Sequence, residues 1–200
     1  KINRTFNIKI KMKKVGITGS LASGKSTASK ILSKGRGPLF SADSTVTKIY
    51  QNKNLKKIIL KKLKMSDSFN LKNKIKQRIE QDKSFIKKLE KAIHPLVRKE
   101  MYKFAKKNKK KNFVFFEIPL LIESRLMKFF DVIFFIKAKK PLRLQRFKLK
   151  GGKKKIFDIL NKKQLNDTVK IKFSDHVVVN EKNIGVLKKN ILDIFRKNYE

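Results

Sequence analysis

Gly19-Ser20-Leu21-Ala22-Ser23-Gly24-Lys25-Ser26, followed by Thr27, is the stretch that indicates the fold of this 200-residue chain. It matches the pattern G-x-x-x-x-G-K-[ST] of a phosphate-binding P-loop. Residues 15–18 before it form an apolar run typical of a buried strand, and residues 27–34 after it have the pattern of a helix. Because a P-loop requires a strand before the loop and a helix after it, the motif predicts a site for ATP or GTP.

Each residue type in the motif has a physical role. Glycines at 19 and 24 let the backbone turn so that its N–H groups point inward at the positive end of the helix dipole, where phosphate oxygens collect. Lys25 is expected to reach the β- and γ-phosphates, and the Ser26 hydroxyl to bind Mg²⁺. We therefore predict that residues 19–27 bind the nucleotide and that Ser26 is a metal ligand.

The composition limits the class of protein. A chain of this length is sufficient for one domain with a buried core. It contains no cysteine, which excludes disulfides, thiolate metal sites and a cysteine nucleophile and fits a reducing cytoplasm. No apolar run approaches the roughly 20 residues of a membrane span, and residues 1–14 are too polar for a signal peptide. We expect a cytoplasmic protein without a membrane partner.

The formal net charge of +39 would suit a partner such as nucleic acid or an anionic surface. However, the lysines are spread over the whole chain and do not alternate with a recognisable motif of stacking aromatic residues. Lysine, asparagine, isoleucine and phenylalanine are enriched together, as A/T-rich codons would produce. We expect no specific nucleic-acid partner, and a basic P-loop protein that binds nucleic acid stays open as an alternative.

The rest of the chain alternates between strand-like and helical segments. Further strands are predicted at residues 39–42, 113–117, 132–136 and 176–179, and further helices at 142–150, 153–165 and 183–198. Residues 44–110 show helical spacing without a strand, and His94-Pro95 is expected to break one of their helices.

These segments predict an α/β fold of three α/β/α layers around a five-stranded, doubly wound parallel sheet. Residues 1–11 are expected to be a disordered tail, and residues 12–200 a single P-loop kinase domain. About residues 51–110 would form a helical lobe that binds the acceptor. About residues 142–170 would form a lid, with Gly151-Gly152 as its hinge.

Two carboxylates follow predicted strands. Asp43 comes at the end of the strand at 39–42, which we expect beside the P-loop strand, and it is the candidate base that accepts the proton of a hydroxyl. The alternative is that Asp43 is the N-cap of the following helix. Glu117 ends the strand at 113–117 and could hold metal-bound water or orient the acceptor. Its alternative role is to close the strand by hydrogen bonds.

Two arginines and one histidine complete the set of candidates. Arg143 and Arg146 lie three residues apart on one predicted helix, so both could face the phosphates when a lid closes. The alternative is a solvated pair. A lone histidine such as His94 is more often structural than catalytic.

The order and spacing of several blocks resemble those of the dephospho-CoA kinase family. These blocks are the P-loop with Gly16-Ile17-Thr18, Ala42-Asp43, Leu89-Glu90-Lys91-Ala92-Ile93-His94-Pro95-Leu96-Val97, Glu117-Ile118-Pro119-Leu120-Leu121-Ile122-Glu123, Gln145-Arg146, Gln164, Lys170 and Ser174-Asp175-His176-Val177-Val178-Val179-Asn180. The resemblance implies transfer of the ATP γ-phosphate to the ribose 3′-hydroxyl of dephospho-CoA. An alternative acceptor is another hydroxyl compound, such as a nucleoside or nucleotide.

The resemblance also implies roles for single residues. Lys25 and Ser26 would bind phosphate and Mg²⁺, Asp43 would be the base, Arg146 the lid arginine, and Asn180 would lie near the adenine. We expect His94, Glu117 and Arg143 to bind the substrate, and the protein to be a monomer or a weak homo-oligomer. This sequence departs from the family pattern at Ser41, where an aspartate is usual, and in the lid at Lys150 and Gly151-Gly152.

Overall fold

Five parallel strands form one sheet in the order β2-β3-β1-β4-β5. The computed structural model describes residues 11–66, 71–82 and 84–200. The strands are β1 (Lys13–Gly19), β2 (Leu39–Ser41), β3 (Phe113–Glu117), β4 (Val132–Lys137) and β5 (His176–Val179). Val15 of the central strand β1 pairs with Phe115 on one side and with Val132 on the other. The sheet confirms the predicted α/β class.

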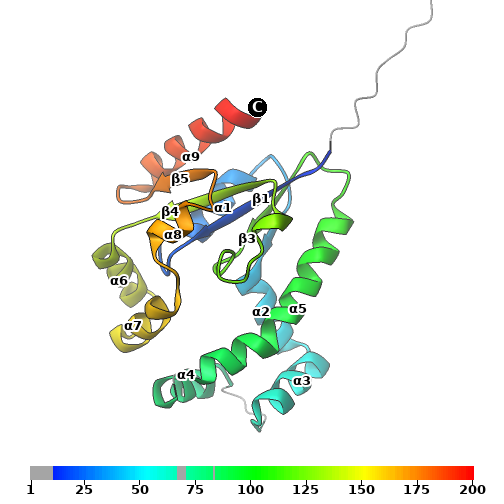
Figure 1. Cartoon of the computed structure of the whole chain (residues 1–200), viewed down its shortest axis with the longest axis vertical. Coiled ribbons are helices and arrows are strands. Elements are labelled where there is room, and N and C mark those ends of the chain that lie inside the picture. Colours follow the sequence, from blue (N-terminus) through cyan, green and yellow to red (C-terminus); the bar gives the residue numbers. More distant parts are fainter. Residues whose placement is uncertain (1–10, 67–70, 83) are drawn as a thin grey trace, which may run out of the picture.

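Helices connect the strands and form the outer layers (Figure 1). They are α1 (Lys25–Ser33), α2 (Ala42–Gln51), α3 (Lys53–Leu63), α4 (Leu71–Gln81), α5 (Phe85–Lys107), α6 (Lys140–Leu149), α7 (Lys154–Lys163), α8 (Asp167–Ile171) and α9 (Ile184–Tyr199), with a 3₁₀ turn at Met127–Phe129. The described residues of segment 44–110 lie in helices α2–α5 and the short connections between and after them, and none of them is in a strand, as predicted. The short helix α8 was not predicted.

The core lies on both faces of the sheet because successive side chains of a strand point to opposite faces. Phe115 packs in a cluster with Leu32 of α1 and Phe195 of α9. Its neighbour Phe116 packs in a second cluster with Met101 of α5. This arrangement explains why the strands are mostly apolar in their interiors, and it supports the end of β1, where the P-loop begins.

A third apolar cluster lies outside the sheet and joins the predicted lobe to the predicted lid. It contains buried residues of α3, α4 and α5, including Ile59, Ile75 and Phe85, together with Ile159 of α7. The boundaries and roles of lobe and lid stay predictions.

Three local predictions were wrong. Helix α5 continues through His94-Pro95 and is bent along its length (Figure 1). A proline inside a helix costs a backbone hydrogen bond, but burial of Ile93 before it and Met101 after it holds the helix together. The strand predicted at 39–42 ends at Ser41, since Ala42 begins α2. That strand pairs with β3, so it is not beside β1.

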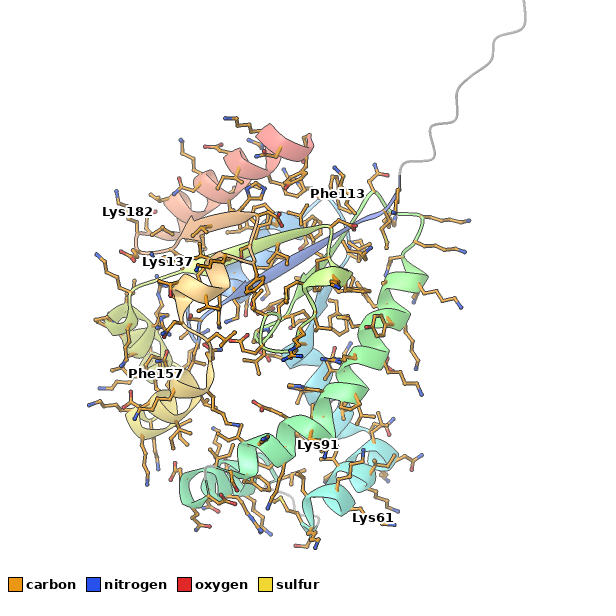
Figure 2. The ribbon with its side chains drawn as sticks, in the orientation of Figure 1. Lys61, Lys91, Phe113, Lys137, Phe157 and Lys182 are labelled. Carbon is orange, nitrogen blue, oxygen red and sulfur yellow. The ribbon has the colours of Figure 1, made fainter. Side chains whose placement is uncertain are left out.

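The positive charge covers many parts of the surface. Figure 2 shows Lys61, Lys91, Lys137 and Lys182 on four separate elements or loops, and all four are exposed. Within the described residues, every helix is too short or too polar to cross a membrane. The predicted tail, apart from Lys11, lies outside the described residues.

Candidate active site

The P-loop joins β1 to α1 and has the backbone shape that its glycines allow. Gly24 is the N-cap of α1 with φ of 98°, a left-handed conformation that side chains rarely adopt. A Cβ at Gly24 would collide with the Asn180 amide, and one at Gly19 with the carbonyl oxygen of Ile136. Both positions therefore need glycine for conformation and for space. The predicted strand, loop and helix are confirmed.

Lys25, the first residue of α1, is buried at the base of a cavity. Its Nζ donates to the backbone oxygen of Ser20 at 3.0 Å. Burial lowers the pKa of Lys25 to about 8, although the negative charges of Asp43 and Glu117 act in the opposite direction. A phosphate next to the ammonium would add negative charge and favour its protonated form. The site therefore presents a desolvated cation to an anionic ligand.

Ser26 lies next to Glu117 at the end of the neighbouring strand. The Ser26 hydroxyl donates to Glu117 Oε1 at 2.5 Å, and the Glu117 side chain is buried. A hydroxyl and a carboxylate oxygen are the kind of ligands that Mg²⁺ prefers. No cluster of three or more His, Cys, Asp or Glu side chains that could hold a metal occurs in the described parts of the chain. The donor set fits Mg²⁺ that takes its remaining ligands from water and phosphate.

Asp43 lies in the first turn of α2 and keeps an exposed surface. The surrounding protein partly desolvates its carboxyl and so raises the pKa of Asp43, the Glu117 carboxylate raises it further, and Lys25 opposes both. The N-cap of α2 is Ser41, whose hydroxyl accepts from the Ser44 N–H at 3.4 Å. The capping role considered for Asp43 therefore belongs to Ser41, and the Asp43 carboxylate is free for another task.

Three cavities meet at Asp43. One of about 630 Å³ lies over the P-loop and is lined by Lys25, Asp43 and Glu117 among others. A second of about 1190 Å³ extends between α2 and α5, and Ser26, Asp43 and Glu117 line it too. A third of about 170 Å³ is bounded by Asp43 and His94. A ligand in any of them can therefore lie beside the Asp43 carboxylate.

The two lid arginines have different surroundings. Arg143 is buried, and its guanidinium donates to the oxygens of Ala138 at 3.1 Å, Leu21 at 3.2 Å and Asn161 Oδ1 at 2.8 Å. Arg146 is half-buried, lines the cavity over the P-loop and donates to the backbone oxygen of Asn180 at 3.1 Å. The structure therefore separates the pair: Arg143 holds α6 and α7 to the P-loop, while Arg146 faces the cavity over the P-loop.

Asn180 and His94 are placed by different contacts. Asn180 Nδ2 donates to the backbone oxygen of Ser23 at 2.8 Å, so its amide supports the P-loop, and the residue also lines the cavity over that loop. His94 is half-buried on α5, and burial lowers the pKa of its imidazole. It lines the small cavity that contains Asp43, but not the cavity over the P-loop.

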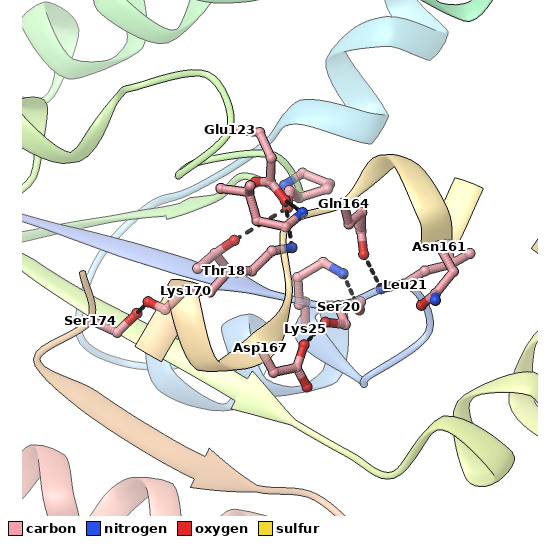
Figure 3. A network of polar contacts seen from close by, with 12 residues as sticks. Thr18, Ser20, Leu21, Lys25, Glu123, Asn161, Gln164, Asp167, Lys170 and Ser174 are labelled. Atoms are coloured by element: carbon pink, nitrogen blue, oxygen red, sulfur yellow. Dashed lines mark hydrogen bonds and ion pairs between the residues drawn. The ribbon is translucent and has the colours of Figure 1, made fainter. Parts of the chain in front are cut away.

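A network from the lid to the P-loop includes contacts that the sequence did not reveal (Figure 3). The Leu21 N–H donates to Gln164 Oε1 at 2.8 Å, and the Ser20 hydroxyl donates to Asp167 Oδ1. Gln164 belongs to a block that resembles the kinase family, but no pattern singled out Asp167 or the lid residue Asn161. Their contacts depend on how α6–α8 pack against the loop.

A buried ion pair completes this network. Lys170 of α8 has no exposed surface, and its Nζ lies 2.6 Å from Glu123 Oε1. The same carboxylate accepts from the Leu165 N–H at 3.1 Å. Because removing one partner would leave a buried charge unpaired, this contact fixes α8 against the loop that follows β3.

Comparison with known proteins gives a consistent result. The family model described as dephospho-CoA kinase matches residues 13–185. A dephospho-CoA kinase of Rickettsia conorii is 32% identical over 183 residues, covering 91% of this chain and 95% of that protein. The solved structure of TT1252 from Thermus thermophilus matches with a TM-score of 0.73 and 22% identity, covering 94% of this chain and 98% of that one. Dephospho-CoA kinase from Campylobacter jejuni matches with a TM-score of 0.57 and 22% identity, covering 93% and 97%.

Proposed function

The chain belongs to the dephospho-CoA kinase family, and we propose that its active site transfers the γ-phosphate of ATP to the ribose 3′-hydroxyl of dephospho-CoA. The activity is the ATP-dependent phosphorylation of dephospho-CoA to coenzyme A. The enzyme is thus a phosphotransferase with an alcohol as acceptor. The assignment of single residues to steps of this reaction is our proposal.

Lys25 and residues 19–27 bind the phosphates of ATP. The loop supplies backbone N–H groups at the N-terminus of α1, and Lys25 supplies a desolvated positive charge. Ser26 and Glu117 would hold Mg²⁺, which when bound neutralises charge on the β- and γ-phosphates. Arg146 lines the same cavity and stabilises the charge that spreads over the transferred group.

Asp43 is the general base. Its carboxylate accepts the proton of the acceptor hydroxyl while the hydroxyl oxygen forms a bond to the γ-phosphorus. The bond between that phosphorus and the bridging oxygen breaks, and ADP leaves. The raised pKa of Asp43 makes its carboxylate a better proton acceptor than an exposed aspartate.

One observation carries this proposal: Asp43 lies on the wall of the P-loop cavity together with Lys25 and Glu117. It also lines the cavity between α2 and α5 and the small cavity beside His94. A hydroxyl beside Asp43 would therefore lie close to the end of a nucleotide bound over Lys25. Arg143, the other arginine of the lid, holds the P-loop in place. His94 lines the small cavity beside Asp43, where it would contact the acceptor.

A panel of acceptors tests the proposal. The purified enzyme is incubated with ATP, MgCl₂ and either dephospho-CoA, a nucleoside or a nucleoside monophosphate, and the products are identified by mass. We expect a mass gain of one phosphoryl group on dephospho-CoA and little on the others. Efficient phosphorylation of a nucleoside or nucleotide, with dephospho-CoA unchanged, would overturn the acceptor assignment.

We also propose that the enzyme acts in the cytoplasm as a monomer or a weak homo-oligomer, without a specific nucleic-acid partner. The dispersed lysines support the last point, because along the sequence they do not alternate with a recognisable motif of stacking aromatic residues. Sedimentation at several protein concentrations, with and without an oligonucleotide, tests the oligomeric state and the nucleic-acid partner. Fractionation of cells tests the compartment.

A further inference from the structure

One ion pair connects the lobe to the lid at the wall of the nucleotide cavity. Lys163 is the last residue of α7, and its Nζ lies 3.5 Å from Glu90 Oε2 of α5. Both side chains line the cavity over the P-loop. The two helices are held together nearby, since Ile159 of α7 packs in the same apolar cluster as Phe85 of α5. The pair therefore lies on the wall of the cavity that we propose for ATP.

The two partners respond to phosphate in opposite ways. A phosphate chain bound over Lys25 repels the Glu90 carboxylate and attracts the Lys163 ammonium. The side chains are 32% and 31% exposed, so the pair itself has only a small free energy. A nucleotide carries several negative charges and is held in place by the loop, so it competes well for the lysine.

Five basic residues line the cavity over the P-loop: Lys25, Arg146, Lys150, Lys163 and Lys182. Lys25 contacts Ser20, and Arg146 donates to backbone oxygens of Ser23 and Asn180. Among the described residues, Lys163 is the one of these five that forms an ion pair with a carboxylate of the lobe. Its ammonium is on a flexible four-carbon stem, so it can change partners without movement of the helix.

We propose that Lys163, which pairs with Glu90, is a lid cation that bound ATP phosphates attract away from that carboxylate. This inference rests on the proposed kinase function and adds a residue to its nucleotide site. ATP binding then breaks one tie between lid and lobe and leaves the Glu90 carboxylate on the wall that it shares with Asp43. By linkage, the Glu90–Lys163 pair weakens ATP binding by the same factor by which bound ATP weakens the pair.

The test measures ATP affinity by calorimetry, with MgCl₂ and without acceptor, for the parent enzyme, K163A, E90Q and the double variant. K163A should weaken ATP binding about tenfold, because it removes a charge-assisted contact. In the E90Q background, the loss of ATP affinity caused by K163A should be about two to five times larger than in the parent enzyme. The reason is that Lys163 in E90Q does not have to leave a carboxylate before it contacts the phosphates. K163R should restore most of the affinity.

A purely structural pair predicts the opposite pattern. If Lys163 only neutralises Glu90, K163A weakens ATP binding by exposing that carboxylate, and the effect vanishes in the E90Q background. That result would overturn the proposal, as would an effect of K163A no larger than that of K162A, the matched control on the same helix. K163Q replaces K163A if the alanine variant does not fold. The calorimetry contains no acceptor, so its result does not depend on which acceptor the enzyme uses. Failure to form coenzyme A in the acceptor panel would therefore contradict the acceptor assignment alone.

Discussion

The Ser26 hydroxyl of the P-loop helix donates to the Glu117 carboxylate at the end of β3, at 2.5 Å. The two residues are far apart in sequence and meet because β3 lies beside β1 in the sheet. Ile17 pairs with Glu117 in the strand register, which brings the carboxylate to the level of the P-loop. This contact joins the loop that binds phosphate to the carboxylate that we propose for Mg²⁺.

Replacing Glu117 by Gln tests this role. The amide oxygen can still accept from Ser26, but the negative charge is lost, so we expect the MgCl₂ concentration for half-maximal activity to rise about tenfold or more. ATP binding measured in EDTA should change little. Asp193→Asn is the control, since Asp193 is an exposed carboxylate of α9 paired with Lys189. An unchanged Mg²⁺ dependence in Glu117→Gln would exclude Glu117 from the metal site.

Lys25→Met should abolish turnover and raise stability at neutral pH. The pKa of Lys25 is about 8 in the folded protein and 10.5 ordinarily, so between these values the unfolded chain holds a proton that the folded chain does not. The stability of the parent enzyme should therefore rise with pH across this window, and the rise should be smaller in the variant. Urea unfolding at about pH 7 and about pH 9.5 measures the difference. Lys30→Met, at an exposed position of α1, is the control.

The sequence predicted those parts of the fold that depend on local pattern. The P-loop, the apolar strands such as 113–117 and the helical segment 44–110 could be identified because each has its own periodicity or motif. The order of the strands in the sheet could not be predicted in this way, because any of several strands could lie beside β1 with the same hydrophobic pattern. For this reason the position of β2 in the sheet was predicted incorrectly.

Tertiary contacts determined what the sequence could not show. Helix α5 continues through Pro95 because burial on both sides outweighs the lost hydrogen bond. The contacts of Asp167 and Asn161 with the P-loop and with Arg143 depend on how the lid packs. The Ser41 cap is the exception, because a serine before a helix was visible in the sequence as Ser41-Ala42-Asp43-Ser44.

The lysine-rich surface should bind nucleic acid only weakly and without sequence preference. Binding through several phosphate contacts loses roughly 10³-fold or more in affinity between about 50 and 200 mM salt. We therefore expect a labelled oligonucleotide to bind at low salt and to dissociate by about 200 mM salt, irrespective of sequence. Fluorescence anisotropy with two unrelated oligonucleotides measures this. Tight, sequence-selective binding at the higher salt would favour a nucleic-acid partner.

Asp43→Asn should separate catalysis from stability. Loss of the general base should lower kcat by about 10²–10⁴-fold while ATP affinity is retained. Burial raises the pKa of Asp43, so the folded state favours its neutral form, and a neutral amide should leave stability at neutral pH unchanged or higher. Ser41→Ala is the matched control: it removes the cap and should cost about 0.5–1 kcal/mol of stability with turnover nearly intact. An intact kcat in Asp43→Asn would leave the base unassigned.

The two lid arginines should give opposite results when each is replaced by alanine. Arg146→Ala removes a cation from the wall of the nucleotide cavity, so we expect kcat to fall about 10²-fold or more with little change in melting temperature. Arg143→Ala removes the donor from the buried carbonyl of Ala138 and from the part-buried oxygens of Leu21 and Asn161, and a buried group without a partner costs about 1–3 kcal/mol. That variant should therefore unfold at a temperature several degrees lower, and its ATP affinity should fall because the P-loop loses support.

Arg143→Lys restores a charge but not the fork of donors, so it should recover little of the stability. Thermal unfolding and steady-state kinetics on the same preparations decide the matter: a large loss of kcat in Arg143→Ala with unchanged stability would place Arg143 on the phosphates instead.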